Sequence, residues 1–294
     1  MATILDLVGN TPMAEIKKLN SNPGVRMFAK LEGNNPGGSV KDRPALNMIR
    51  SALERGDIKP GTKLVEATSG NTGIALAMIA SMFNLEIELV MPSSSTRERT
   101  LTMEAFGAKV TLLENIETCR DYAEDKGARK GYFLLNQFAN PDNYFAHYKT
   151  TGPEIWKDTG GTITHFVSSM GTTGTIMGTS MFLKEKNPAI QIVGCQPTEE
   201  ASIPGIRRWP AAYLPKIFDP KRVDRTMDIS QQEAIDHTRL LAKKEGIFAG
   251  MSSGGAASAA IRLAKELTTG VIVFIACDRG DRYLSSDLFG NPTL

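Results

Sequence analysis

The feature of this sequence that most constrains its fold is an alternation of short apolar runs with longer amphipathic segments. The short runs are rich in β-branched residues, which is typical of strands, and they are VRMFAKLE, KLVEA, EIELVMP, KVTLLE, ITHFVSS, QIVGCQP and VIVFIAC. Segments with a helical period lie between them, namely residues 44–55, GIALAMIASMF, IMGTSMFLKE, QEAIDHTRLLAKKE and GAASAAIRLAKEL. This order predicts a doubly wound α/β fold with mainly parallel strands.

The length of the chain allows either one large domain or two of moderate size. It has 294 residues, of which 41% are hydrophobic and 22% charged, and that is enough apolar surface for a substantial core. The segment PDNYFAHYKTTGPE, residues 141–154, is polar, aromatic and turn-rich. We expect a junction between domains there.

Charge and cysteine usage exclude several classes of function. The 34 basic and 32 acidic residues give a net charge of +2, so neither nucleic acid nor an anionic membrane is indicated as a partner. Cys119, Cys195 and Cys277 lie far apart and form no CxxC pair. They predict free thiols in a reducing compartment, the cytoplasm, rather than a disulfide framework or a zinc site. The scattered histidines indicate no metal.

We expect neither a secretion signal nor a membrane span in this sequence. Its first residues, MATILDLVGNTPM, lack the basic region and the long apolar region of a secretion signal. The apolar run VIVFIAC is too short to cross a bilayer.

Small polar residues gather in three loops where the expected strands meet helices: EATSGNTG, SSMGTTGT and AGMSSGGA. Ligands of doubly wound folds bind at the carboxyl ends of the strands. In Gly171–Thr175, which we call the phosphate cup, glycine lets the backbone approach a ligand and the amides of the following helix start form an anion site. Neither GxxxxGK[ST] nor GxG occurs, which excludes the P-loop and the dinucleotide fingerprint. A plain turn, or ordinary helix capping, remains the alternative for each loop taken alone.

A lysine stands where a helix is expected to begin, in the stretch GNNPGGSVKDRPA, residues 33–45. Ser39 and Asp42 have the spacing of a capping box, whereas Pro44 favours a helix that begins at Asp42 and holds the proline in its first turn. Either register puts Lys41 at the positive end of the helix dipole, which disfavours its ammonium form. A neutral amine is a nucleophile suited to an aldehyde; a solvated lysine is the alternative.

Taken together, these parts suggest pyridoxal phosphate as a cofactor. The lysine would bind the aldehyde carbon, and the phosphate cup would hold the 5′-phosphate. The loop EATSGNTG, whose residues 68–72 we call the substrate loop, would receive the carboxylate of an amino-acid substrate.

Longer motifs resemble a known family. The segments GNNPGGSVKDR, EATSGNTGIALAMIA, HFVSSMGTTGT, SIPGIRRWP, EGIFAGMSSGGA and CDRGDRYL together resemble the cysteine synthases (O-acetylserine sulfhydrylases), and their B isozymes in particular. The resemblance runs from about Asn10 to about Leu284. It implies a tryptophan synthase β-like, fold-type-II pyridoxal-phosphate enzyme with two doubly wound parallel-sheet domains and the cofactor in the cleft between them. It also implies a larger, cofactor-anchoring domain at residues 1–34 and 146–294, a smaller, mobile domain at residues 35–145, and a homodimer.

The resemblance assigns roles to individual residues. Lys41 carries the cofactor as a Schiff base, Asn71 hydrogen-bonds the ring 3′-oxygen, and Ser252 faces the pyridine nitrogen. The neutral hydroxyl of Ser252 would leave the ring a weaker electron sink than a carboxylate would, which suits β-elimination; a helix N-cap is its alternative role. The phosphate is assigned to Gly171, Thr172, Thr173, Gly174 and Thr175. The substrate carboxylate is assigned to Thr68, Ser69, Gly70, Thr72 and Gln137.

The implied reaction is a β-replacement. The acetate of O-acetyl-L-serine leaves, giving an α-aminoacrylate, and a sulfur nucleophile adds to the β-carbon while Lys41 moves the α-proton. Sulfide would give L-cysteine and thiosulfate would give S-sulfocysteine. Arg207 and Arg208 stand beside Trp209 in a segment at the mouth of the B-type site. Because fixed guanidinium groups favour an oxyanion, we predict that thiosulfate is accepted; solvated surface charge is the alternative.

Other functions stay open. KDRPA has Pro44 where the B-type pattern often has alanine, and some relatives that use O-phosphoserine share it. A cystathionine β-synthase-like enzyme, or a serine or threonine deaminase, would use the same parts. Because CDRGDRYL lies near the end of the sequence, we expect no regulatory domain, which disfavours the multi-domain cystathionine β-synthases. A catalytically silent protein that binds a partner's peptide is opposed by Lys41, Asn71 and Ser252. Cys277 matches a cysteine that B isozymes carry near the cofactor, or it is a small buried residue.

Overall fold

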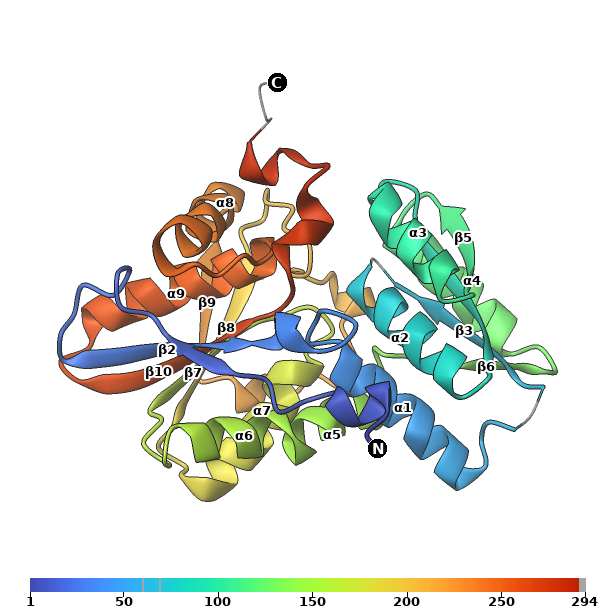
Figure 1. Ribbon diagram of the computed structural model, residues 1–294, viewed down its shortest axis with the longest axis horizontal. Helices are drawn as coiled ribbons and strands as arrows, with labels where there is room; N and C mark the ends of the chain where they lie inside the picture. Colours follow the sequence, from blue (N-terminus) through green and yellow to red (C-terminus); the bar gives the residue numbers. More distant parts are fainter. Residues whose placement is uncertain (60, 69, 291–294) are drawn as a thin grey trace.

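The structure, a computed structural model, describes residues 1–59, 61–68 and 70–290. Within these residues two sheets form two lobes, with helices on both faces of each sheet (Figure 1). All neighbouring strands are parallel except the pair β1–β2. The predicted α/β fold with two doubly wound, mainly parallel sheets is therefore confirmed.

The larger sheet has the strand order β1-β2-β10-β7-β8-β9. Its strands are Met13–Glu15 (β1), Val25–Leu31 (β2), His165–Ser169 (β7), Gln191–Pro197 (β8), Arg225–Ile229 (β9) and Gly270–Ala276 (β10). The smaller sheet has the order β5-β4-β3-β6. Its strands are Lys63–Ala67 (β3), Glu86–Pro92 (β4), Lys109–Leu113 (β5) and Tyr132–Leu134 (β6).

The α-helices cover both faces of each sheet. They are Asp42–Arg55 (α1), Asn71–Met82 (α2), Arg97–Ala105 (α3), Ile116–Gly127 (α4), Pro141–Lys149 (α5), Thr151–Asp158 (α6), Gly174–Lys186 (α7), Gln231–Leu240 (α8) and Met251–Glu266 (α9). A π-helical turn, Leu241–Glu245, follows α8. Short 3₁₀ turns lie at Ile4–Leu7, Glu32–Asn34, Ala211–Tyr213, Pro220–Arg222, Gly280–Tyr283 and Asp287–Phe289. Within the described ranges, no helix is long and apolar enough to cross a membrane.

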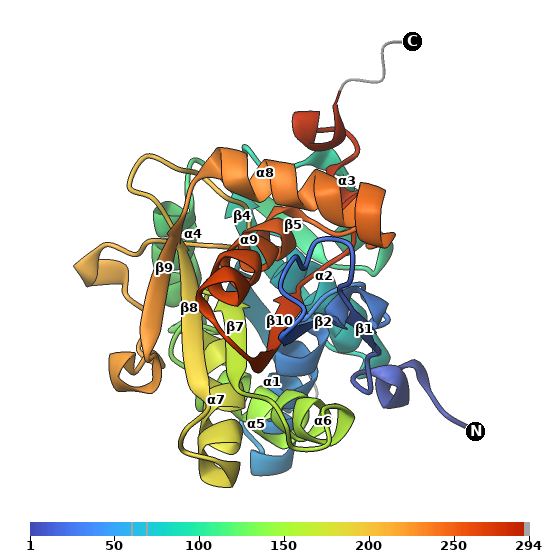
Figure 2. The ribbon, with the colours of Figure 1, turned by 90° about the vertical axis from the view of Figure 1, so that its left-hand side faces the viewer.

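The larger sheet is buried on both faces, which explains its continuous apolar strands. In β10, Ile272 and Phe274 belong to the core that also holds Ala256 of α9. Val273, between them, belongs to the opposite core, with Ile176 of α7. Figure 2 shows α8 and α9 on one side of this sheet and α5, α6 and α7 on the other.

The smaller sheet is built in the same way. Leu64 and Leu89 pack with residues of α1 and α2, whereas Val65 and Val90 pack on the other face with Cys119 of α4. Successive side chains of a strand point to opposite faces, so each strand contributes to two cores.

The structure differs from the sequence prediction at residues 141–154. We expected a turn-rich junction there, but the segment forms α5 and the first half of α6. Asn140 caps α5 by accepting a hydrogen bond from the amide of Asp142 at 2.9 Å, and Pro141 takes the first helical position. The chain does pass from the smaller to the larger sheet between β6 and β7. The domain limits at residues 34/35 and 145/146 stay a prediction.

Candidate active site

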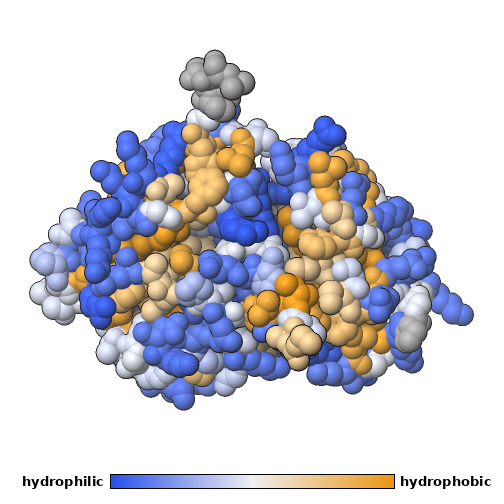
Figure 3. All heavy atoms as spheres, in the orientation of Figure 1, coloured by the Kyte–Doolittle hydropathy of each residue, from blue (hydrophilic) through white to orange (hydrophobic). Residues whose placement is uncertain are grey.

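A cavity of about 280 Å³ lies between the two lobes, where strands of both sheets lead into helices. Hydrophilic side chains gather between the lobes on the face drawn in Figure 3, with apolar patches on either side. Many of the residues predicted from the sequence line this cavity: Lys41, Gly70, Asn71, Thr72, Gln137, Gly171, Thr172, Thr175, Arg207 and Ser252. The two predicted anion loops and the lysine therefore come together, from segments far apart in the sequence.

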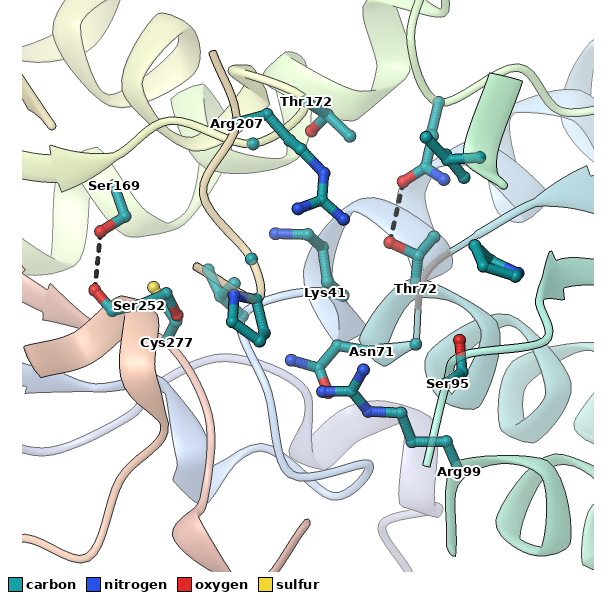
Figure 4. Close-up of a pocket in the computed structure, with 18 of the residues that line it drawn as sticks. Lys41, Asn71, Thr72, Ser95, Arg99, Ser169, Thr172, Arg207, Ser252 and Cys277 are labelled. Atoms are coloured by element: carbon teal, nitrogen blue, oxygen red, sulfur yellow. Dashed lines mark hydrogen bonds between the residues drawn. The ribbon is translucent and has the colours of Figure 1, made fainter. Parts of the chain in front are cut away.

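Lys41 extends into the cavity from the start of α1 (Figure 4). The helix begins at Asp42 with Lys41 as its N-cap, so the register favoured by Pro44 is confirmed. Removal from solvent lowers the pKa of the Lys41 amine, while the negative charges of the nearby carboxylates Asp278 and Glu32 oppose this shift. The lysine is thus biased toward the neutral amine, the form that acts as a base or nucleophile.

A buried ion-pair network fixes the segment that carries Lys41. Arg43 donates from Nε to Glu32 at 2.7 Å and from Nη1 to Glu154 of α6 at 2.6 Å. Lys30 of β2, which is fully buried, lies 2.9 Å from Glu154. Because a buried charge is strongly destabilising without its partners, these contacts hold the start of α1 against the larger lobe.

The phosphate cup connects β7 to α7. Thr173 has a φ of 72°, a left-handed conformation that is uncommon for threonine. A Cβ added to Gly174 would collide with Oδ1 of Asn143, so only glycine fits there. Thr175 lies 3.3 Å from Nε2 of His147, and burial lowers the pKa of this histidine well below its ordinary value. Thr173 and Gly174 shape the cup from behind and do not line the cavity.

The cup fits a phosphate group. The first amides of α7 have no carbonyl partner within the helix, and a helix start favours an anion. The Thr173 hydroxyl is buried and has no hydrogen-bond partner within the described part of the chain. A Cβ on Gly171 would lie 2.8 Å from the carbonyl oxygen of Gly205. Such a close backbone approach excludes a side chain at position 171.

The substrate loop precedes α2 in the smaller lobe. The hydroxyl of Thr68 accepts hydrogen bonds from the amides of Gly70 and Gly73, each at 3.1 Å. Thr68 is buried and does not line the cavity, so it shapes the loop instead of facing a ligand. Ser69, also predicted for the carboxylate, lies outside the described residues. Gly70 has a φ of 152°, which L-residues rarely adopt.

Gln137 faces the substrate loop and is fixed from several sides. The hydroxyl of Thr72 donates to Oε1 of Gln137 at 2.8 Å, and Nε2 of Gln137 donates to the carbonyl oxygen of Ala67 at 2.7 Å. Behind it, the carboxylate of Glu66 accepts from the amides of Asn136 at 2.7 Å and Gln137 at 3.2 Å. Burial raises the pKa of Glu66 to about 8. The sequence analysis missed this carboxyl group, whose signal is a glutamate inside the strand run KLVEA.

Asn71, the first residue of α2, bridges the two lobes. Its Nδ2 donates to Asp278 at 2.6 Å and its Oδ1 accepts from Arg282 at 2.6 Å. Tyr283 also donates to Asp278, at 2.6 Å. An amide nitrogen carries two hydrogens, so Asn71 can donate to Asp278 and to a ligand ring together. The motif CDRGDRYL was recognised in the sequence, but these contacts across the cleft were not predicted.

Ser252 and Cys277 line the side of the cavity formed by the larger lobe (Figure 4). Helix α9 begins at Met251 with Gly250 as N-cap, so the alternative role of Ser252 as N-cap is wrong. The carbonyl oxygen of Ser252 accepts a hydrogen bond from the Ser169 hydroxyl at 2.7 Å. Burial raises the pKa of the Cys277 thiol to about 11, which keeps it neutral.

The two predicted arginines point in different directions. Arg207 enters the cavity and points toward Lys41 (Figure 4). Arg208 instead donates to the carbonyl oxygen of Pro197 at 2.9 Å and pairs with Asp228 at 2.8 Å, outside this cavity. The expectation that both guanidinium groups face the site is therefore wrong for Arg208. Arg99, which was not predicted, adds a further cation to the lining.

Comparison with known proteins agrees with this geometry. A family model described as "Pyridoxal-phosphate dependent enzyme" matches residues 4–278. The chain is 60% identical to "Cysteine synthase B" of Pseudomonas aeruginosa, with 98% of this chain and 97% of that protein covered. It is 54% identical to "Cysteine synthase B" of Escherichia coli, with 99% and 97% covered. Its structure is similar to that of a cysteine synthase from Entamoeba histolytica, with a TM-score of 0.92, 37% identity, and 98% and 90% covered.

The fold and the site thus define a pyridoxal-phosphate enzyme of fold type II, and the chain belongs to the family of pyridoxal-phosphate dependent enzymes. Within that family, the chain is similar over nearly its full length to proteins named cysteine synthase B.

Proposed function

We propose that the protein is a cysteine synthase that replaces the acetate of O-acetyl-L-serine by a sulfur nucleophile. The observation that carries this proposal is the convergence of Lys41, the phosphate cup and the substrate loop on one cavity. The names of the relatives, at 54% and 60% identity, support the same activity. When bound, pyridoxal phosphate supplies a conjugated ring that accepts the electron pair released at the α-carbon.

The residues of the chain divide the work around that ring. The amides of the phosphate cup would hold the phosphate, Lys41 would be the attachment point, and the neutral Ser252 hydroxyl would face the ring nitrogen. The substrate loop and Gln137 would bind the substrate carboxylate. Lys41 Nζ, biased toward the neutral amine because burial lowers its pKa, accepts the α-proton and later returns it as general acid. Exclusion of water from the cleft protects the reacting carbon.

Arg207 supports a role for thiosulfate as a second sulfur donor. Its guanidinium points into the cavity beside Lys41 (Figure 4), and burial lowers its pKa while Glu117 opposes that shift. A buried guanidinium is stabilised by an anion, and a dianion gains more from it than hydrosulfide does. Sulfide would give L-cysteine and thiosulfate would give S-sulfocysteine.

The test is turnover of O-acetylserine and O-phosphoserine, each crossed with sulfide and thiosulfate. We expect turnover of O-acetylserine with both sulfur donors. Arg207→Ala should lower kcat/KM for thiosulfate relative to sulfide by about tenfold or more, as expected for a lost charged hydrogen bond. Arg208→Ala, the matched control, should change this ratio less than about twofold. A preference for O-phosphoserine, or equal ratios in both variants, would contradict the proposal.

A homodimer in a reducing compartment, the cytoplasm, completes the proposal. The dimer rests on the family resemblance and can be checked by analytical ultracentrifugation. Support for the compartment comes from Cys119, Cys195 and Cys277, which are free thiols.

A further inference from the structure

Arg120 is a cation of the smaller lobe that contacts a loop of the larger lobe. It lies on α4, one turn after Ile116, which lines the cavity. Its Nη1 donates to the carbonyl oxygen of Tyr213 at 2.9 Å. Its guanidinium carbon lies 4.3 Å from the ring centre of Phe138 and 5.1 Å from that of Tyr213. Both distances are within the range of cation–π attraction.

The loop that Arg120 contacts carries Arg207. We call residues 202–213 the arginine loop. On its inner side, the Arg207 amide donates to the carbonyl oxygen of Met170 at 2.9 Å. Trp209 Nε1 donates to the carbonyl oxygen of Gly171, in the phosphate cup, at 2.8 Å. The loop is thus attached to the cup on one side and to α4 on the other.

Aromatic rings connect Arg120 to the part of the arginine loop that contacts the phosphate cup. Trp209 meets Phe138 edge to face, with ring centres 5.5 Å apart. The Arg120 guanidinium carbon is also 5.6 Å from the Trp209 ring centre. Removal of the Arg120 side chain would therefore open a gap next to Trp209 and release the end of the loop at Tyr213.

Arg207 has little side-chain support of its own. Within the described residues its side chain makes one hydrogen bond, from Nη1 to the carbonyl oxygen of Ile206 at 3.5 Å, which is a long and weak contact. The direction of its guanidinium thus depends on the backbone of the arginine loop. Binding of thiosulfate, a small dianion, depends on this direction more than binding of hydrosulfide does. A shift of the loop would break the directed pair of hydrogen bonds that the guanidinium can donate to thiosulfate.

We propose that Arg120 is a positioning residue for the anionic sulfur donor, since it holds the arginine loop and hence Arg207 at the cavity. The inference rests on the proposed β-replacement with thiosulfate. It also ties donor choice to the relative position of the two lobes, because Arg120 and Arg207 come from different lobes.

Trp209 provides a direct readout that needs no turnover. The chain has two tryptophans, so Trp156→Phe leaves Trp209 as the sole reporter. In that background, which is the parent protein for this test, we compare Arg120→Met with Arg129→Met. The Arg129 side chain is exposed and pairs with Asp125. Arg120→Met should raise acrylamide quenching of Trp209 about twofold, because cation–π packing no longer covers the ring, whereas Arg129→Met should match the parent. Quenching equal to the parent in Arg120→Met would overturn the proposal.

Steady-state kinetics of the holoenzyme test the functional half. Arg120→Met should raise KM for thiosulfate about tenfold and KM for sulfide about twofold or less, with kcat/KM for O-acetylserine within about twofold of wild type. Arg120→Lys should restore part of the difference. Equal loss with both donors would overturn the proposal. If the wild-type enzyme does not turn over thiosulfate at all, the proposed donor is wrong, and the role of Arg120 is tested by binding instead. Thiosulfate is then titrated while Trp209 emission is followed. We expect weaker binding to Arg120→Met than to the wild type, and equal binding would overturn the proposal.

Discussion

The phosphate cup and the substrate loop have the same design but different backing. Both follow a strand of a parallel sheet, both are rich in glycine and hydroxyl side chains, and each leads into a buried helix. Behind the cup, a Cβ on Gly178 of α7 would collide with the backbone of Tyr144 in α5. Behind the substrate loop, a Cβ on Gly70 or Gly73 would instead meet the side chains of Arg99 and Met103.

This difference suggests a division of labour between the lobes. Helices packed backbone to backbone have little freedom to shift, so the cup can hold a resident group in a fixed place. Long side chains such as those of Arg99 and Met103 can change rotamer at low cost. We therefore expect the cup to anchor the cofactor and the substrate loop to adjust to each incoming substrate.

The largest effect is expected from an added methyl group in the cup. Gly174→Ala places a Cβ against the side chain of Asn143, which hydrogen bonds to Gln137 and Thr172 hold in place, so either that side chain or α7 must shift. We expect the affinity for pyridoxal phosphate, measured by absorbance titration, to fall about 100-fold, the upper range for overpacking. The double variant Gly174→Ala/Asn143→Ala should recover part of the loss. Wild-type affinity in Gly174→Ala would show that the cup is as adaptable as the substrate loop.

A smaller and different effect is expected in the substrate loop. Thr72→Val keeps the shape of the side chain but removes the hydrogen bond to Gln137. KM for O-acetylserine should rise about tenfold, because one polar partner is left unsatisfied, while cofactor affinity stays within about twofold. Thr100→Val on α3, whose hydroxyl donates a long, weak hydrogen bond to the Met91 sulfur at 3.8 Å, is the control. A matching loss of cofactor affinity in Thr72→Val would remove the distinction between the two loops.

The sequence predicts the fold well because buried parallel strands leave a strong pattern. The apolar runs that were read as strands correspond to β2, β3, β4, β5, β7, β8 and β10. Three-residue strands such as Tyr132–Leu134 are too short for a period to be visible. The sequence analysis did not predict helix α5, because PDNYFAHYK mixes aromatic and polar residues without an apolar stripe. The one sequence signal for this helix is its N-cap, Asn140 followed by Pro141.

The sequence predicts which loops form the site better than how each side chain points. Arg207 and Arg208 are neighbours in a loop without regular secondary structure, where no periodic pattern tells which side chain enters the cavity, and only Arg207 does. Thr68 turns inward to hold backbone amides. The contact of Glu66 with Asn136 joins residues 70 positions apart, and a single sequence contains no signal for it.

A further expected effect, on the stability of the fold and not on substrate or cofactor binding, is the pH dependence that comes from Glu66. Its pKa is raised to about 8 by burial, whereas an unfolded chain would have the ordinary value near 4.5. Between these values the folded state binds more protons, so this group stabilises the fold at low pH and the contribution declines as pH rises toward 8. In Glu66→Gln this decline, at most about 1.4 kcal/mol per pH unit, should vanish from urea unfolding curves of the cofactor-free chain. An unchanged slope would mean that Glu66 is ionised across this range.

The central claim is that one buried amine, Lys41, serves the cofactor. The most direct measurement is borohydride reduction of the cofactor-loaded protein followed by peptide mass mapping. The account predicts a stable pyridoxyl adduct on Lys41 and none in Lys41→Ala. An adduct on another lysine of the wild-type chain, or on none, would contradict it.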